Sequence, residues 1–250
     1  MRGEEFAADL ATSAGEVLLA IRKEHLAAGT AEGKALAKAG DRGAQEHIAE
    51  RLAAERPDDA VLSEEAADDL RRLESERVWI IDPLDGTREY SEDRHDWAVH
   101  VALWERGSLT AGAVALPGLG TTLSTAGEFP DLGPPAEPIR LAVSRSRASD
   151  LVKAVAAEYG AELVPMGSAG YKVSAVVRGE VDAYVHSGGQ YEWDSAAPVA
   201  VAAAAGLHTS RIDGSALEYN REDPYLPDLL VCRPSLAKGL LEIIGQHQAV

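Results

Sequence analysis

Apolar residues recur at helical spacing in two stretches near the start of the chain. The first stretch covers residues 4–26 and predicts an amphipathic helix. The second covers residues 40–57 and predicts another helix, with Asp41 near its N-cap and Pro57 just past its end. The chain is therefore expected to open with two helices.

Strand patterns replace the helical ones after residue 60. Residues 61–66 and 76–82 are short apolar runs that end in polar residues, and residues 96–117 alternate with the period of a strand. A turn at 106–108 would fold the alternating stretch into an antiparallel hairpin. The first half is thus expected to contain a sheet with antiparallel character.

Gly and Pro residues concentrate between positions 118 and 138, which indicates the end of a hairpin followed by a linker. Beyond it, strands and helices alternate as in a layered α/β unit. We expect an N-terminal α+β subdomain over 1–137 and a C-terminal α/β subdomain over 138–250. The expected elements of the second are strand 139–144, helix 149–159, strand 161–165, helix 168–179, strand 181–186, helix 194–205, strand 228–232 and a final helix.

Composition limits what the protein can bind. The 250 residues carry a net charge of −17, and so acidic a surface repels nucleic acid phosphates. No apolar run reaches the roughly 20 residues that cross a bilayer, and the first residues lack a secretion-signal pattern. The single cysteine, Cys232, rules out an internal disulfide and fits a reducing compartment. We expect a cytoplasmic protein that binds neither nucleic acid nor membranes.

The stretch WIIDPLDGT, residues 79–87, places two aspartates where an apolar strand ends. Asp-Pro and Asp-Gly are ordinary turn dipeptides, so the stretch alone is as consistent with a turn as with a site. If the stretch is a site, Pro83 stiffens the turn and leaves the Leu84 carbonyl free to point inward. Asp82 and Asp85 then return to the same point. Two carboxylates and a carbonyl suit a hard cation such as Mg²⁺.

The end of this stretch and two further segments could complete such a site. Gly86 and Thr87 could open a helix whose first N–H groups accept an anion. Glu64 and Glu65 follow the preceding strand, and Asp194 begins an Ala-rich helix. Taken alone, Asp194 is readily explained as an N-cap. Together the segments favour a two-metal site beside a phosphate seat.

Glu-Glu, WIIDPLDGT and WDSAAP, in this order and spacing, closely resemble the inositol monophosphatase superfamily of Mg²⁺-dependent, lithium-sensitive phosphatases. The resemblance covers essentially the whole chain. DPLDGTREY, VSRSR and GSAGYK are similar to segments of its CysQ group, the 3'(2'),5'-bisphosphate nucleotidases. The resemblance implies an α/β (α+β) sugar-phosphatase fold, layered α-β-α-β-α, with two subdomains and the site between them.

The resemblance also implies a set of metal ligands. Glu64, Asp82 and the Leu84 carbonyl would bind the first ion, and Asp82, Asp85 and Asp194 the second. Most ligands would thus belong to the N-terminal subdomain, and Asp194 to the C-terminal one. The implied cofactor is Mg²⁺ as two or three ions, with Mn²⁺ as an alternative and Li⁺ and Ca²⁺ as inhibitors.

The implied catalytic residues are Glu64, Thr87 and Asp41. In the family an aspartate ahead of the second helix pairs with the motif threonine to activate a water, and Asp41 and Thr87 match those positions. A third, weaker ion would sit near Glu64 and Asp41 through water. Around Asp41 the stretch ALAKAGD lacks the family's usual Val-Thr. The expected reaction is in-line hydrolysis of a phosphate monoester, with the ions holding phosphate oxygens and lowering the pKa of a water.

The CysQ group implies 3'-phosphoadenosine 5'-phosphate as the substrate, hydrolysed to AMP and phosphate in sulfate assimilation. The alternatives are a broad phosphatase for inositol 1-phosphate or fructose 1,6-bisphosphate, a non-catalytic cation-dependent binding protein, and a plain α/β scaffold with N-cap acids. Many relatives are homodimers and some of the nucleotidase branch are monomers, and of the two states a homodimer is the one expected. The substrate-binding residues implied are Asp85, Gly86, Thr87, Ser168, Lys172 and Asp194.

Each of four further residues has both a functional and a structural interpretation. Lys172 could meet a ribose oxygen or a second phosphate, or it could be a solvated helix lysine. Arg145 and Arg147 could orient a phosphate, or they could cap the next helix. His186 could stack on or hydrogen-bond to a ligand, or it could be a strand-end histidine facing solvent.

Overall fold

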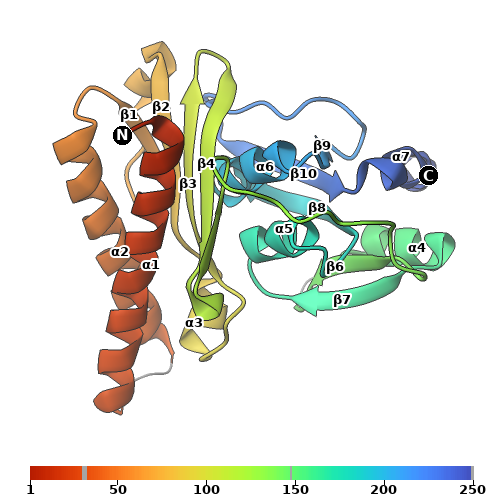
Figure 1. Cartoon of the computed structure of the whole chain (residues 1–250), viewed down its shortest axis with the longest axis horizontal. Helices are drawn as coiled ribbons and strands as arrows, with labels where there is room; N and C mark the ends of the chain where they lie inside the picture. The colour runs from red at the N-terminus through yellow and green to blue at the C-terminus, as the bar shows by residue number, and fades with distance from the viewer. Residues whose placement is uncertain (30–32, 147, 249–250) are drawn as a thin grey trace.

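A computed structural model describes residues 1–29, 33–146 and 148–248 of the chain. The elements form five layers: an outer helix pair, a sheet, a middle helix pair, a second sheet and a further outer helix pair (Figure 1). The layered α-β-α-β-α architecture expected from the resemblance is confirmed.

The first two layers come from the first half of the chain. The outer helices cover one face of a sheet with strand order β1-β2-β3-β4-β5, in which β1 and β2 are parallel and the other neighbours antiparallel. The expected hairpin of 96–117 is formed by β3 and β4. The bounds are α1 Gly3–Ala27, α2 Lys34–Glu55, β1 Ala60–Ser63, η1 Leu70–Glu74, β2 Arg77–Asp85, α3 Thr87–Ser91, β3 Ala98–Glu105, β4 Ser108–Leu116, η2 Pro117–Leu119 and β5 Thr121–Ser124.

The start of α2 corrects one prediction. The helix begins at Lys34 rather than near residue 40, so Asp41 is an interior helix residue and not an N-cap. The stretch KALAKAG consists mostly of Ala, Leu and Lys, which are strong helix formers and extend the helix toward the N-terminus. The side chain of Asp41 is therefore not used by the helix end.

The second half supplies the other layers. Its sheet has the order β7-β6-β8-β10-β9, with α4 and α7 on the outer face and α5 and α6 between the two sheets (Figure 1). β9 was not predicted, because three residues are too few to show a pattern. The bounds are β6 Arg140–Ser144, α4 Asp150–Tyr159, β7 Glu162–Met166, α5 Ala169–Val177, β8 Ala183–Tyr191, α6 Glu192–Ala204, β9 His208–Ser210, β10 Tyr225–Cys232 and α7 Pro234–Gln248.

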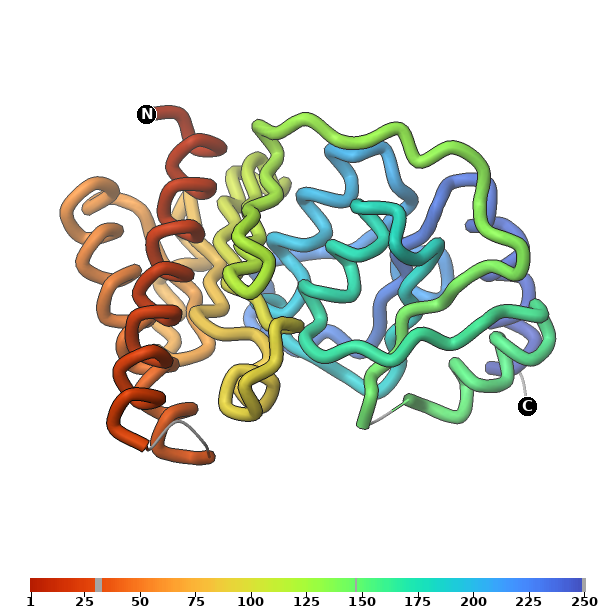
Figure 2. Tube along the Cα trace, turned by 60° about the horizontal axis from the view of Figure 1, so that its bottom comes forward, coloured from red at the N-terminus to blue at the C-terminus, as the bar shows by residue number. Residues whose placement is uncertain are grey.

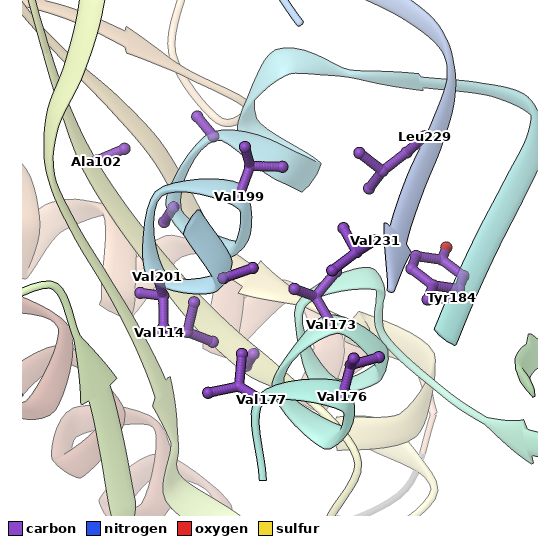
Figure 3. Packing of buried hydrophobic residues seen from close by; sticks show 14 of the residues in the cluster. Ala102, Val114, Val173, Val176, Val177, Tyr184, Val199, Val201, Leu229 and Val231 are labelled. Atoms are coloured by element: carbon purple, nitrogen blue, oxygen red, sulfur yellow. The ribbon is translucent and has the colours of Figure 1, made fainter. Parts of the chain in front are cut away.

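The middle helices α5 and α6 share one apolar core with both sheets. Ala102 and Val114 from the first sheet, Val173 from α5 and Val231 from the second sheet belong to the same cluster (Figure 3). The alternate residues of β3, such as Val101, instead pack beneath α1 and α2. Each face of the first sheet is thus buried against a different pair of helices.

A long connection joins the halves. Between β5 and β6 the chain crosses the outside of the middle layer from one sheet toward the other (Figure 2). The two halves meet again along the ends of β2, α5 and α6, which frame the cleft described below. Within the described ranges, no helix combines the length and the apolar character that a bilayer span requires.

Candidate active site

A β-bulge at the end of β2 brings the two motif aspartates together. Residues three apart on a regular strand face opposite sides of the sheet. Here Asp82 lies opposite His100 of β3, and the next pair, Asp85 with Ala98, is shifted by one residue. The extra residue turns Asp85 back to the face of Asp82. One ligand atom from each of Asp82, Asp85 and His100 lies within 4.8 Å of the others.

His100 is a member of the site that the sequence analysis missed. It is fully buried, and its Nδ1 donates a hydrogen bond to the Trp193 carbonyl at 2.9 Å. Its Nε2 lies 3.3 Å from Asp85 Oδ2, in a close contact that lacks regular hydrogen-bond geometry. A Cβ at Gly170 would come within 1.9 Å of Nε2, so only glycine fits beside the ring. The signal was available, because His100 interrupts a strand whose flanking residues are apolar.

Asp85 is held in its ionised form. Its Oδ2 accepts hydrogen bonds from Ser168 Oγ at 2.5 Å and from the Gly170 N–H at 2.7 Å. Burial alone would raise the pKa of Asp85, but the adjacent His100 and these donors lower it to about 2. Ser168 was predicted to contact substrate. It orients this carboxylate and caps α5 by accepting from Tyr171 N.

The other acids show the opposite shift. Burial, followed by the charge of Glu64, raises the pKa of Asp82 well above its ordinary value. Partial withdrawal from water and the charge of Asp194 raise the pKa of Glu64 to about 7. Burial and the charge of Asp85 raise the pKa of Asp194 to about 6, although Asp194 also caps α6 by accepting from Tyr191 N at 2.7 Å. Four acids, three from the end of the first sheet and one from a middle helix, therefore feel one another's charge.

This set of side chains fits a divalent cation. Carboxylate oxygens are the ligands that Mg²⁺ prefers, and mutual repulsion among buried carboxylates is relieved by a cation between them. Leu84 is buried beside this group, and its N–H donates to Asp82 Oδ1 at 3.0 Å. That bond fixes the turn, while the Leu84 carbonyl accepts from Thr87 Oγ1 at 3.1 Å.

Thr87 and Asp41 lie close to each other at the edge of the acid group. Thr87 Oγ1 is 3.4 Å from Asp41 Oδ1, a long hydrogen bond. Burial, followed by the charge of Glu65, raises the pKa of Asp41 to about 6. The structure thus places the predicted pair side by side, although Asp41 comes from within α2.

A buried network joins the loop after Glu64 to the start of α6. The carboxylate of Glu192 accepts the backbone N–H groups of Asn220 and Arg221 at 2.6 and 2.8 Å. Arg72, which is almost fully buried, donates to the Asn220 side chain and to the Arg221 carbonyl, both at 2.7 Å. The network holds two chain segments that carry acids of the site, and nothing in the sequence motifs indicated it.

A cleft of about 960 Å³ opens above the acids, between the two halves of the chain. The predicted residues Gly86 and Thr87 lie on its wall, and aromatic residues of β8 and α6 form the other side. Residues lining the cleft include Glu64, Asp85, Gly86, Thr87, Arg88, Glu89, Ser168, Lys172, Tyr184, His186, Tyr191, Trp193 and Asp194.

The structure contradicts the interpretation of Lys172 as a solvated helix lysine. Its side chain is buried rather than solvated, and Nζ donates to the carbonyls of Gly167 and Ser168 at 2.6 and 2.7 Å. Nζ also lies 5.2 Å from the centre of the Tyr184 ring. Burial lowers the pKa of Lys172 to about 8. The lysine braces the Gly167-Ser168 turn at the floor of the cleft.

Arg145 and His186 also have defined partners. Arg145 donates to Glu89 Oε1 and Glu92 Oε2, both at 2.6 Å, and so connects the start of the second half to α3. His186 Nε2 donates to the Gly189 carbonyl at 3.0 Å within the cleft wall. Arg147 lies outside the described residues.

Comparisons with known proteins identify the family. The model of the inositol monophosphatase family matches residues 2–130 and 136–249, so the chain belongs to this family. A Mycobacterium leprae protein named 3'-phosphoadenosine 5'-phosphate phosphatase is 52% identical over 259 residues, covering 96% of this chain and 92% of the relative. A Mycobacterium bovis protein of the same name is 53% identical, with 93% and 89% covered.

More distant relatives share the group or the fold. The Escherichia coli K12 protein named 3'(2'),5'-bisphosphate nucleotidase CysQ is 30% identical over 68% of this chain and 74% of its own length. A crystal structure of CysQ from Bacteroides thetaiotaomicron matches with a TM-score of 0.72 and 26% identity, covering 92% of this chain and 96% of that one. Inositol monophosphatase II from Staphylococcus aureus matches with a TM-score of 0.80 at 17% identity over 97% and 96%, which shows a shared fold.

Proposed function

We propose that the protein is a Mg²⁺-dependent phosphatase that hydrolyses 3'-phosphoadenosine 5'-phosphate to AMP and phosphate. The observation that carries the proposal is the group of four interacting acids, three of which line the cleft while Asp82 is buried beside them. The near full-length identity to relatives named for this substrate supports the choice of ester.

Within this proposal, the metal ligands are Glu64, Asp82, the Leu84 carbonyl, Asp85 and Asp194. Mg²⁺, when bound, supplies positive charge for the phosphate oxygens and for the leaving oxygen. Two ions carry four positive charges, which equals the charge of the four carboxylates. An acidic protein could then admit a doubly phosphorylated substrate at this one place.

Thr87 and Asp41 would handle the proton of the attacking water. Thr87 Oγ1 has one proton, directed at the Leu84 carbonyl or Asp41, and its lone pairs remain able to accept from a water. A carboxylate whose pKa is about 6 is ionised at neutral pH and still basic enough to receive a proton. Asp41 is therefore the general base of the proposed mechanism, and Thr87 orients the water.

The proposal is tested by measuring phosphate release from 3'-phosphoadenosine 5'-phosphate, inositol 1-phosphate and fructose 1,6-bisphosphate side by side. We expect the nucleotide to have the highest kcat/KM, and activity to disappear with EDTA and return with Mg²⁺. Faster turnover of inositol 1-phosphate by a wide margin would remove the nucleotide assignment. A chain that neither releases phosphate nor binds Mg²⁺ by calorimetry would be a scaffold only.

A further inference from the structure

An exposed aromatic ring of the cleft wall, Tyr191, packs against a second exposed ring, Tyr225. Tyr191 and Tyr225 are 45% and 49% exposed, and they are the only aromatic members of the exposed large hydrophobic residues in the described part of the chain. Their ring centres are 6.1 Å apart in an edge-to-face arrangement. Water-exposed aromatic faces gathered at one place on a monomer surface indicate a binding site.

The local backbone is shaped around these rings. A Cβ at Gly189 would come within 2.3 Å of the Tyr225 hydroxyl, and Gly189 has a φ of +84°, a conformation that favours glycine. The Gly189 carbonyl is held by His186 Nε2 at 3.0 Å. Tyr191 is itself stacked on Trp193, with ring centres 4.8 Å apart and an interplanar angle of 14°. Tyr191 is therefore backed by Trp193, while its side chain remains nearly half exposed.

Tyr191 lies next to the acids that would hold Mg²⁺ and, through it, the phosphate. The backbone N–H of Tyr191 donates to Asp194 Oδ2 at 2.7 Å, and Tyr191, Trp193 and Asp194 all line the same cleft. A phosphate held by a metal ion at Asp194 would place the alcohol part of the ester within reach of the Tyr191 ring. The bond to the Asp194 carboxylate comes from the backbone N–H of Tyr191, so changing the Tyr191 side chain does not remove the donor of that bond.

We propose that Tyr191, backed by Trp193, stacks against the base of a nucleotide and so makes the site selective for nucleoside phosphates. This inference rests on the proposed function and adds a residue that determines specificity. A flat, uncharged heteroaromatic ring gains from stacking on an aromatic face, whereas a polyhydroxylated ring offers no such surface. A neutral base is also not repelled by the acidic chain.

The test compares wild type with Tyr191→Leu and the matched control Tyr191→Phe. Base–aromatic stacking is lost in the leucine variant, so its KM for 3'-phosphoadenosine 5'-phosphate should rise roughly tenfold, while kcat stays within about twofold. The phenylalanine variant keeps the stacking face and should stay within about twofold of wild type. The dissociation constant of AMP, measured by calorimetry with Mg²⁺ present, should follow the same order.

Inorganic phosphate serves as the probe without a base. Its inhibition constant should be the same for wild type and Tyr191→Leu, because the acids and their metal are unchanged. An unaltered KM and AMP affinity in the leucine variant would overturn the proposal, as would an equal weakening of phosphate. If wild type prefers inositol 1-phosphate, the proposed function fails, and the AMP calorimetry still decides whether Tyr191 binds a base.

Discussion

Asp82 and Asp85 stand three residues apart in one motif, yet their pKa values are shifted in opposite directions. The motif predicted that Asp82 and Asp85 converge, and they do, although a β-bulge rather than a simple turn causes it. The motif could not show that the pKa values of the two carboxyl groups shift in opposite directions. His100 and Ser168 lower the pKa of Asp85, whereas burial raises that of Asp82. Those partners come from β3 and from the start of α5, which only the tertiary fold brings together.

Replacing Asp82 with Asn should separate activity from folding. We expect phosphate release to fall by more than about 100-fold, beyond the loss typical of an outer-shell partner. Without Mg²⁺ the variant should melt at the same or a higher temperature, because one repelled, buried charge is gone. The rise in Tm with added Mg²⁺ should shrink. Asp150→Asn, at a fully exposed side chain, is the control. A fully active Asp82→Asn variant would contradict the metal assignment.

The raised pKa values also predict a pH dependence for the metal-free protein. Glu64 and Asp194 have ordinary pKa values of 4.5 and 3.8 that rise to about 7 and about 6 in the folded chain. Between pH 4 and pH 7 the native state therefore holds more protons than the unfolded state, so the free energy of unfolding falls as pH rises. Urea unfolding in EDTA across this range measures it. Added Mg²⁺ should weaken this dependence of the free energy of unfolding on pH. A free energy of unfolding that increases toward pH 7 in EDTA would argue against the raised pKa values of Glu64 and Asp194.

At the scale of elements, patterns identified most helices and strands, and their ends were the weaker part. The start of α2 was placed too late, since nothing in KALAKAG stops a helix, and β9 was too short to detect. The pattern also could not show which elements touch. Gly40 of α2 illustrates this, because a Cβ there would lie 2.7 Å from the Tyr90 ring and 3.1 Å from Leu84.

Gly40→Ala should therefore disturb the crossing of α2 over α3. Alanine gains up to about 1 kcal/mol in helix propensity, but overpacking costs about 1–3 kcal/mol, so a net loss of stability is expected. Activity should fall as well, because Asp41 is the next residue and its distance to Thr87 depends on the same crossing. Gly245→Ala in α7, where a Cβ meets nothing within 4 Å, should instead be neutral or stabilising. Equal effects of the two substitutions in urea unfolding would contradict the crowding at Gly40.

At the scale of the whole molecule, we propose subdomains over 1–137 and 138–250 that share their core. The cluster in Figure 3 joins β3 and β4 of the first half to α5, α6 and β10 of the second. The Gly- and Pro-rich linker predicts where the boundary falls in the sequence. It does not predict a shared core, because apolar periodicity does not show which element an apolar face packs against. Separate unfolding of the halves is therefore not expected.

Unfolding should occur in one transition for the full chain. Trp79 and Trp97 are buried in the core beneath α1 and α2, so tryptophan fluorescence reports mainly on the first half. Far-UV circular dichroism reports on the helices of both halves. In each condition, with Mg²⁺ or without it, the fluorescence and circular dichroism signals should give the same urea midpoint as each other. Two resolved midpoints would show that the halves unfold independently.

The position of α5 and α6 between the sheets has a consequence for recombining relatives. A chimera joined at residue 137 would take the strands that carry the proposed metal ligands from one parent and both middle helices from the other. The foreign helices would then have to pack against β3 and β4, and Gly170 would have to clear whatever side chain stands at position 100. Exchanging substrate preference by swapping halves would thus require replacing a whole layer of the core. Exchanging only the residues around Tyr191 would leave that layer intact.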